Sequence, residues 1–156
     1  MSYDRNQQEK FQRRPAEDKL AVAKVFLAEH PFKKEWISIG SDAEMIAFSE
    51  QVGGFLAKGG PEQQLSTSQI RNIFGEIKRI QLKGLSDPAA LASFMLLKPK
   101  VAYAEGRKQN QGIFVFRRYF DSAWATVLEN DRGRRFENFC YLLEAILAYH
   151  KANGGK

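Results

Sequence analysis

Apolar residues recur every three to four positions along most of this chain, and that spacing constrains the fold more than any other feature. The repeat is cleanest between Ser66 and Gly84, where the intervening residues are mostly polar. Positions three and four apart share one face of an α-helix, so the pattern predicts a helix with a single buried stripe. The stripe consists of Ile70, Ile73, Phe74, Ile77 and Ile80.

The same spacing predicts helices elsewhere in the chain. Pro15 is expected to open the first helix and Pro31 to end it, because proline is tolerated only at a helix start. Pro99 lies inside another helical pattern and predicts a kink or a break there. The further helices are expected within residues 15–30, 41–59, 87–107, 112–131 and 134–153. Helix N-caps are expected at Ser41 with Glu44 completing a capping box, at Ser66 or Thr67, and at Asp87.

These segments predict an all-α fold, a compact bundle of five to six helices with no sheet. The one segment that could be extended is Ile113 to Phe116. A length of 156 residues fits one domain, so we expect residues 15–156 to form a single helical bundle. Residues 1–14 are polar and charged and are expected to form a flexible arm. The predicted core residues lie mid-stripe and include Phe74, Phe120, Phe139 and Leu143.

The positive charge of the chain is concentrated in its middle third. The formal net charge is +6, and the stretch from Ser66 to Arg118 holds ten basic residues against three acidic ones. The remainder of the chain is therefore close to neutral. A charge excess gathered in one stretch is typical of proteins that bind a polyanion, although a solvated helical surface rich in lysine and arginine gives the same count.

No set of residues predicts an enzyme, a cofactor or a metal site. The two histidines, His30 and His150, sit at predicted helix ends, where a cation complements the helix dipole. They show no metal-ligand spacing with Cys140. The glycine pairs Gly53–Gly54 and Gly59–Gly60 lack the pattern of a phosphate-binding loop and are read as a helix defect and a helix stop.

The same features bear on where the protein acts. One cysteine allows no internal disulfide, which fits a reducing compartment. No run approaches the roughly 20 apolar residues that a membrane span needs, and the N-terminus lacks a signal peptide. We therefore predict a cytoplasmic location and no membrane partner.

The basic residues are the candidate binding site, and their spacing suits contact with successive phosphates rather than readout of bases. Basic residues that avoid the isoleucine stripe are expected on one helix surface, and two lysines flank Pro99. Tyr103 and Tyr119 neighbour these segments and could stack on a base, although such tyrosines more often pack the ring and leave the hydroxyl wet. The candidate RNA-binding residues are Arg71, Lys78, Arg79, Lys98, Lys100, Arg107 and Lys108.

Three sequence blocks together resemble a known family, the small subunit of type III-A CRISPR effector (Csm) complexes. Their order and spacing match that family over roughly residues 62–151. The first block is Leu65-Ser66-Thr67-Ser68-Gln69-Ile70-Arg71 with Lys78-Arg79-Ile80. The second is Leu97-Lys98-Pro99-Lys100-Val101-Ala102-Tyr103-Ala104 with Gly106-Arg107. The third is Phe136-Glu137-Asn138-Phe139 with Glu144-Ala145-Ile146 and Ala148-Tyr149-His150-Lys151.

The resemblance implies a small, all-helical subunit without catalytic activity. Several copies would stack along a ribonucleoprotein filament, beside a larger subunit that holds the guide RNA. They would help to hold the duplex of guide RNA and target RNA, while cleavage and cyclic-nucleotide synthesis belong to other subunits. The partners implied are guide RNA, target RNA, other Csm subunits and further copies of the chain. The candidate basic residues would face RNA or a neighbouring subunit.

Two other functions remain open from the sequence. A helical adaptor could present the same basic surface to an acidic protein partner and never touch nucleic acid. An enzyme with a cryptic site is the third hypothesis, and the absence of a nucleophile–base pair or metal-ligand set argues against it.

Overall fold

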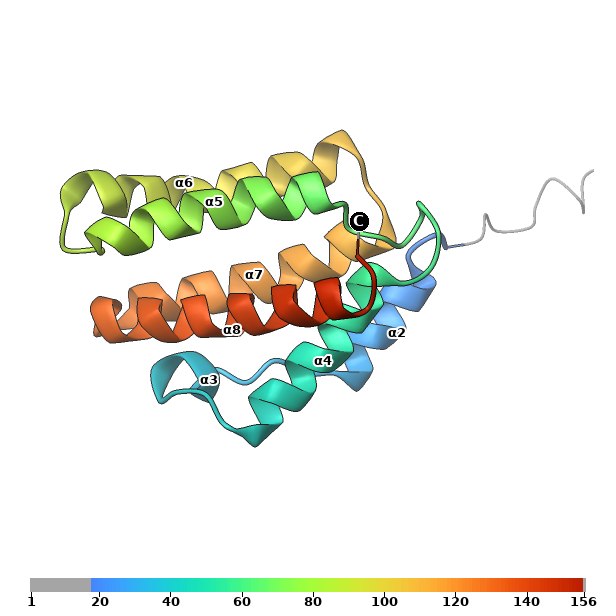
Figure 1. Cartoon of the computed structure of the whole chain (residues 1–156), viewed down its shortest axis with the longest axis horizontal. Helices are drawn as coiled ribbons and strands as arrows, with labels where there is room; N and C mark the ends of the chain where they lie inside the picture. Colours follow the sequence, from blue (N-terminus) through green and yellow to red (C-terminus); the bar gives the residue numbers. More distant parts are fainter. Residues whose placement is uncertain (1–17, 156) are drawn as a thin grey trace, which may run out of the picture.

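The structure is a computed structural model that describes residues 18–155, and all regular secondary structure within that range is helical (Figure 1). The predicted all-α class is confirmed, but the described part holds seven helices rather than five or six. The segment from Ile113 to Phe116, the one candidate for extended structure, is helical. The helices are α2 (Ala21–Glu29), α3 (Glu35–Ser38), α4 (Ala43–Ala57), α5 (Thr67–Lys83), α6 (Pro88–Arg107), α7 (Gln111–Glu129) and α8 (Arg132–Ala152).

Two of the predicted N-caps are confirmed and one is wrong. The Ser66 hydroxyl accepts a hydrogen bond from the Gln69 amide nitrogen and forms a capping box with that residue. Asp87 caps α6, with Pro88 at its first position. The cap of α4 is Asp42 rather than Ser41, because the Asp42 carboxylate accepts the Met45 amide hydrogen at 2.8 Å.

The outcomes differ at two prolines for which the sequence predicted a helix start and an interruption. Pro15 and the predicted arm lie outside the described residues, and α2 begins at Ala21. Of the kink or break predicted at Pro99, the break does not occur, because helix α6 continues through that residue. A proline removes one backbone hydrogen bond, and packing of the surrounding turns can hold the helix together across that gap.

The additional helix, α3, is a single turn that the sequence pattern did not predict. It carries Trp36 and Ile37, which are both buried, and it packs against α8. The Asn138 side chain donates a hydrogen bond to the Ile37 carbonyl oxygen at 2.9 Å. A helix this short has no repeat to detect, so tertiary contacts rather than local pattern hold it.

The helices form three layers. Helices α7 and α8 lie in the middle, the pair α5 and α6 covers one side, and α4 with α2 and α3 covers the other (Figure 1). The buried apolar side chains of all seven helices form one continuous core. No helix within residues 18–155 is both long and apolar enough to cross a membrane.

The core is rich in aromatic rings where α6, α7 and α8 meet. Phe94 packs edge-on against Phe136 and Phe139, with ring centroids 5.5 and 5.6 Å apart. Phe94 and Phe139 are fully buried. The backbone oxygen of Phe94 also accepts a hydrogen bond from the Trp124 indole at 2.9 Å. All four predicted core residues are confirmed as buried: Phe74, Phe120, Phe139 and Leu143.

Gly53 is a packing position rather than a helix defect. A Cβ atom added there would lie 2.6 Å from the Tyr149 Cβ and 2.8 Å from the His150 nitrogen. Side chains need more room than that, so the absence of a side chain lets α4 approach the backbone of α8 directly. Helix α4 runs unbroken through the glycine pair to Ala57.

The loop between α4 and α5, residues 58–66, is tied to three helices. The Leu65 amide donates to the Leu56 carbonyl oxygen at the end of α4, at 2.9 Å. The Leu65 carbonyl oxygen lies 3.0 Å from His150 Nε2 on α8. The Gln111 amide at the start of α7 donates to the Glu62 carbonyl oxygen at 2.8 Å. These bonds fix the end of the molecule at which α5 begins.

The predicted role of His150 as a charged helix terminus is wrong. Its side chain is 2% exposed, and burial lowers the pKa of the imidazole below its usual value. His150 is therefore a neutral hydrogen-bonding group near pH 7. Tyr119 is also structural, because it is buried and its hydroxyl donates to the His30 carbonyl oxygen at 2.6 Å.

Candidate nucleic-acid interface

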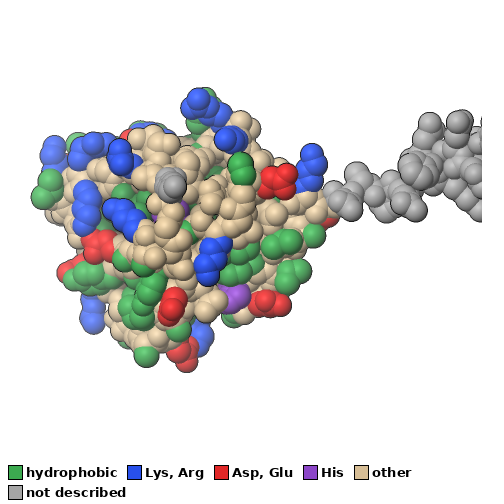
Figure 2. All heavy atoms as spheres, turned by 45° about the vertical axis from the view of Figure 1, so that its right-hand side comes forward, with side chains coloured by type: hydrophobic (Ala, Val, Ile, Leu, Met, Phe, Trp, Pro, Cys, Tyr) green, Lys and Arg blue, Asp and Glu red, His purple; other side chains and the backbone are tan. Residues whose placement is uncertain are grey.

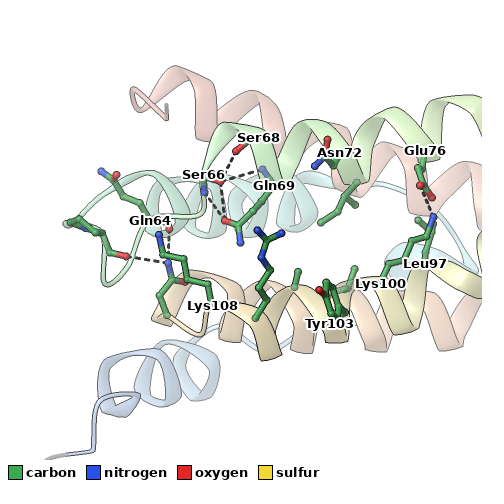
Figure 3. A pocket seen from close by; sticks show the side chains of 16 residues that line it. Gln64, Ser66, Ser68, Gln69, Asn72, Glu76, Leu97, Lys100, Tyr103 and Lys108 are labelled. Carbon is green, nitrogen blue, oxygen red and sulfur yellow. Dashed lines mark hydrogen bonds and ion pairs between the residues drawn. The ribbon is translucent and has the colours of Figure 1, made fainter.

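A groove of about 640 Å³ runs between α5 and α6 on the outer face of the molecule (Figure 3). It exists because the isoleucine stripe of α5 turns toward the core, so polar side chains form the α5 wall. That wall is made of Ser66, Ser68, Gln69, Asn72 and Glu76, with Ile73 at its base. The α6 wall is made of Leu97, Lys100, Val101, Tyr103, Ala104 and Arg107.

Three of the predicted RNA-binding residues line this groove, namely Lys100, Arg107 and Lys108. All three are exposed. The Lys100 ammonium group forms an ion pair across the groove with Glu76, at 2.6 Å (Figure 3). Glu76 is the one acidic side chain that lines this groove. Glu76 neutralises one cation of the groove while no ligand is bound.

A second hollow of about 400 Å³ continues along the same two helices toward the α5–α6 turn. It shares Glu76 and Lys100 with the first groove and adds Arg79 and Lys83. Lys83 belongs to the basic stretch between Ser66 and Arg118, but it was not among the predicted RNA-binding residues. Together the two hollows carry five cationic side chains and one acidic one. We call this surface the α5–α6 face, defined by Arg79, Lys83, Lys100, Arg107 and Lys108.

The distribution of charge on the face drawn in Figure 2 agrees with this placement. In Figure 2 most of the visible lysine and arginine side chains lie in the upper half, which holds α5 and α6, and most acidic side chains lie lower. A surface on which one sign of charge dominates attracts polyanions over a distance of about one Debye length, roughly 8–10 Å in physiological salt.

The other three predicted residues, Arg71, Lys78 and Lys98, lie off this face. Arg71 and Lys78 share a face of α5, as their spacing predicts, but they do not line the groove. Lys78 is paired with Glu144 on α8. The Lys98 ammonium group lies 5.0 Å from the centre of the Trp124 ring on α7. One residue separates Lys98 from Lys100, and successive helical residues point about 100° apart. The Lys98 side chain therefore lies against α7, whereas the Lys100 side chain lies in the groove beside α5.

Two further arginines of the basic stretch, both partly exposed, are held by ion pairs with a buried acid of the protein itself. Glu105, which is 6% exposed, pairs with both Arg117 and Arg118. The Arg118 guanidinium also stacks over the Phe114 ring at 3.6 Å. A buried carboxylate needs such partners, and the network joins the end of α6 to α7. Both arginines are paired with Glu105. The net charge counted from the sequence of this stretch is therefore larger than the positive charge left unpaired for a ligand.

Two kinds of reactive site can be checked in the described residues, a metal centre and a free thiol. No group of three or more histidine, cysteine, aspartate or glutamate side chains within residues 18–155 could hold a metal ion. Burial raises the pKa of the Cys140 thiol to about 12, which leaves it protonated and unreactive near neutral pH. What the geometry offers is an open, polar, cation-lined groove.

Comparison with known proteins gives the same family as the three sequence blocks. A family model described as Csm2 Type III-A matches residues 42–156, which include both walls of the groove. A protein of Enterococcus italicus described as "CRISPR system Cms protein Csm2" is 31% identical over 93 residues. That alignment covers 56% of this chain and 66% of the relative. No solved structure matches the chain. Because the family model spans well over half of the sequence, the chain belongs to the type III-A Csm2 family, the small subunits of Csm complexes.

Proposed function

We propose that this chain is a non-catalytic subunit of a Csm ribonucleoprotein and that it holds RNA through the α5–α6 face. Family membership supports the place in a Csm complex. The observation that carries RNA binding is the surplus of five cations over one acid along two adjacent hollows. The side chains that line them reach phosphate oxygens without presenting a rigid pattern of base-reading groups, so binding should tolerate any sequence.

In this proposal the RNA is the guide–target duplex or an adjoining single strand, and each copy of the chain holds one segment of it. Stacking of several copies along a filament needs two different faces for head-to-tail contact. Arg71, Lys78 and Lys98 lie off the α5–α6 face, and we propose that they contact neighbouring subunits or RNA held by them, Lys78 and Lys98 after leaving Glu144 and Trp124.

The test is a triple variant, Lys100→Ala/Arg107→Ala/Lys108→Ala, measured for RNA affinity across a range of salt concentrations. The logarithm of affinity should fall with the logarithm of salt by about 0.7 per phosphate contacted on a single strand. Removing three cations should weaken binding to all sequences and flatten that slope by up to about two units. The fold should be unaffected, because all three side chains are exposed.

A matched control comes from the same two helices. The variant Arg71→Ala/Lys78→Ala/Lys98→Ala removes the same charge from outside the groove, and it should keep most of the affinity and slope. Equal losses in the two variants would show that overall charge, not the α5–α6 face, governs binding. Unchanged affinity and slope in the groove variant would refute the proposed site.

A protein partner is the second candidate function, and exposed apolar residues favour it. Leu82 on α5 is 88% exposed and Leu96 on α6 is 55% exposed. An adaptor with an acidic partner would use this mixed basic and apolar surface. Absence of any salt-dependent binding of the wild-type chain to RNA would make that function the better one.

A further inference from the structure

We propose that the groove between α5 and α6 takes one unpaired nucleotide, with its base stacked on Tyr103 and the flanking phosphates held by Lys100 and Arg107. This inference depends on the proposed binding of RNA to the α5–α6 face. It goes further because it names the ligand element, an unstacked base, and the side chain that holds it.

Tyr103 is unusual among the aromatic residues of the protein. Its side chain is 71% exposed, and Tyr141 at 44% is the other exposed aromatic side chain within residues 18–155. The Tyr141 hydroxyl donates to Glu137, whereas Tyr103 makes no hydrogen bond or ring contact with any described residue. Tyr103 is therefore mostly exposed, and its ring lies on the groove wall without an aromatic or hydrogen-bond partner among the described residues (Figure 3).

The position of Tyr103 between two cations suits a nucleotide. Lys100 lies three residues before it and Arg107 four residues after it, so all three share one face of α6. The two cations are separated by about 10 Å along the helix axis. A strand that follows α6 could thus place phosphates near both cations while a base between them meets the ring.

The opposite wall and floor of the groove supply the remaining contacts. Ile73 and Ala104, which line the groove and are both partly exposed, form an apolar base on which the edge of a ring can rest. Gln69 uses its side-chain oxygen in the capping box with Ser66, and its amide group is directed into the groove (Figure 3). The amide hydrogens have no partner among the described residues, so they can donate to a sugar or a base. The volume of about 640 Å³ lies within the usual range for small-ligand pockets.

A paired base could not use this site, because both faces of a base within a duplex are covered by its neighbours. Base–aromatic stacking is sequence-tolerant, since every base has a π face. The site should therefore select for unpaired nucleotides without selecting among the four bases. Cations alone would bind single strands and duplexes by charge without this distinction.

The experiment compares Tyr103→Ala and Tyr103→Phe with Tyr141→Ala, using fluorescence anisotropy of three RNA probes. The probes are a short single strand, the same ribose-phosphate strand without bases, and the fully paired duplex. Tyr103→Ala should weaken binding of the single strand by about 5- to 150-fold, as expected for loss of one stacked base. Its salt slope should equal that of the wild type, because no cation is removed. Tyr103→Phe and Tyr141→Ala should bind like the wild type.

The other probes decide the origin of any loss. Tyr103→Ala should leave affinity for the base-free strand and the duplex unchanged, and urea denaturation should show that its fold is intact. Equal losses on all three probes, or equal losses for Tyr103→Ala and Tyr141→Ala, would overturn the nucleotide site while leaving backbone binding by the α5–α6 face in place. Wild-type RNA affinity combined with loss of Csm-subunit binding would also overturn it and would assign Tyr103 to a protein contact. If the triple variant Lys100→Ala/Arg107→Ala/Lys108→Ala binds RNA like the wild type, the proposed function and this nucleotide site fail together.

Discussion

Two pairs of neighbouring helices in this protein meet in opposite ways. Helix α4 lies directly against α8, where Gly53 offers no side chain and the Tyr149 Cβ would be 2.6 Å from a substituent there. Helices α5 and α6 also run side by side, but their outer edges are separated by a groove of about 640 Å³. One junction is closed and structural, and the other is open and available to a ligand.

The difference follows from the residues that face each junction. Small and apolar side chains exclude water and gain dispersion contacts when two helices close on each other. Charged and amide side chains lose hydration if they are enclosed, so a junction lined by them stays open to solvent. On the inner side of this pair Ile77 of α5 and Phe94 of α6 are buried in the core, whereas Gln69 and Lys100 line the open groove.

The largest expected effect lies in the core, where α8 packs against the buried side of α6. Phe139→Ala removes a fully buried ring that packs against Phe94 and Phe120. It should lower the free energy of unfolding by about 3–5 kcal/mol, measured by urea denaturation. Leu82→Ala, at a side chain that is 88% exposed, is the control and should change stability by less than about 0.5 kcal/mol. A loss below 1 kcal/mol for Phe139→Ala would mean that the aromatic core is not packed as described.

The next effect tests the closed junction itself. Gly53→Ala places a methyl group against the backbone of α8 and should destabilise the protein by about 1–3 kcal/mol. Gly75→Ala, within α5, meets no atom within 4 Å and should instead stabilise the helix by about 0.4–1 kcal/mol. The two variants differ only in surroundings. Equal changes would show that helix propensity, not the α4–α8 contact, governs both.

A smaller effect, on RNA affinity, is expected at the open junction between α5 and α6. Glu76→Gln removes the carboxylate that pairs with Lys100 at 2.6 Å and frees that lysine for phosphate. Such exposed pairs contribute about 0.2–1 kcal/mol, so RNA affinity should rise by up to about fivefold at low salt. Glu144→Gln frees Lys78 outside the groove in the same way and should give no gain. Equal gains in both variants would point to net charge alone.

The smallest effect concerns His150. This residue lies in the last turn of α8, beside the α4–α8 contact, and its ring contacts Leu65 in the loop that leads into α5. Burial lowers its pKa in the folded state, so the unfolded state binds the proton more tightly. Stability should therefore be full above about pH 6.5, the ordinary histidine value, and should fall as the pH drops below it. Denaturation midpoints between pH 7.5 and 5.5 should show this fall, and His150→Gln should reduce it. An unchanged pH dependence in that variant would rule out His150 as its source.

The sequence pattern predicted the long helices well and the site only in part. Stripes such as Ile70 to Ile80 predict burial because helical period alone fixes which positions share a face. The same period could have separated Lys98 from Lys100, which lie on different surfaces of α6. It could not reveal Glu76 as the partner of Lys100, because that pairing depends on how α5 lies beside α6. The role of Gly53 was equally hidden, since α8 lies far along the chain.

That long separation has a consequence for how the protein reaches its native state. The α4–α8 junction joins segments with three helices between them, whereas α5, α6 and α7 each meet the next helix in sequence. Closing a long loop costs chain entropy that must be offset before distant contacts form, and local contacts form faster. The hairpin of α5 and α6 should therefore assemble early, and α4 should dock late. In kinetic measurements Gly53→Ala should then speed unfolding and leave the folding rate nearly unchanged, so the tightest junction in the native protein would be the last to form and the first to open.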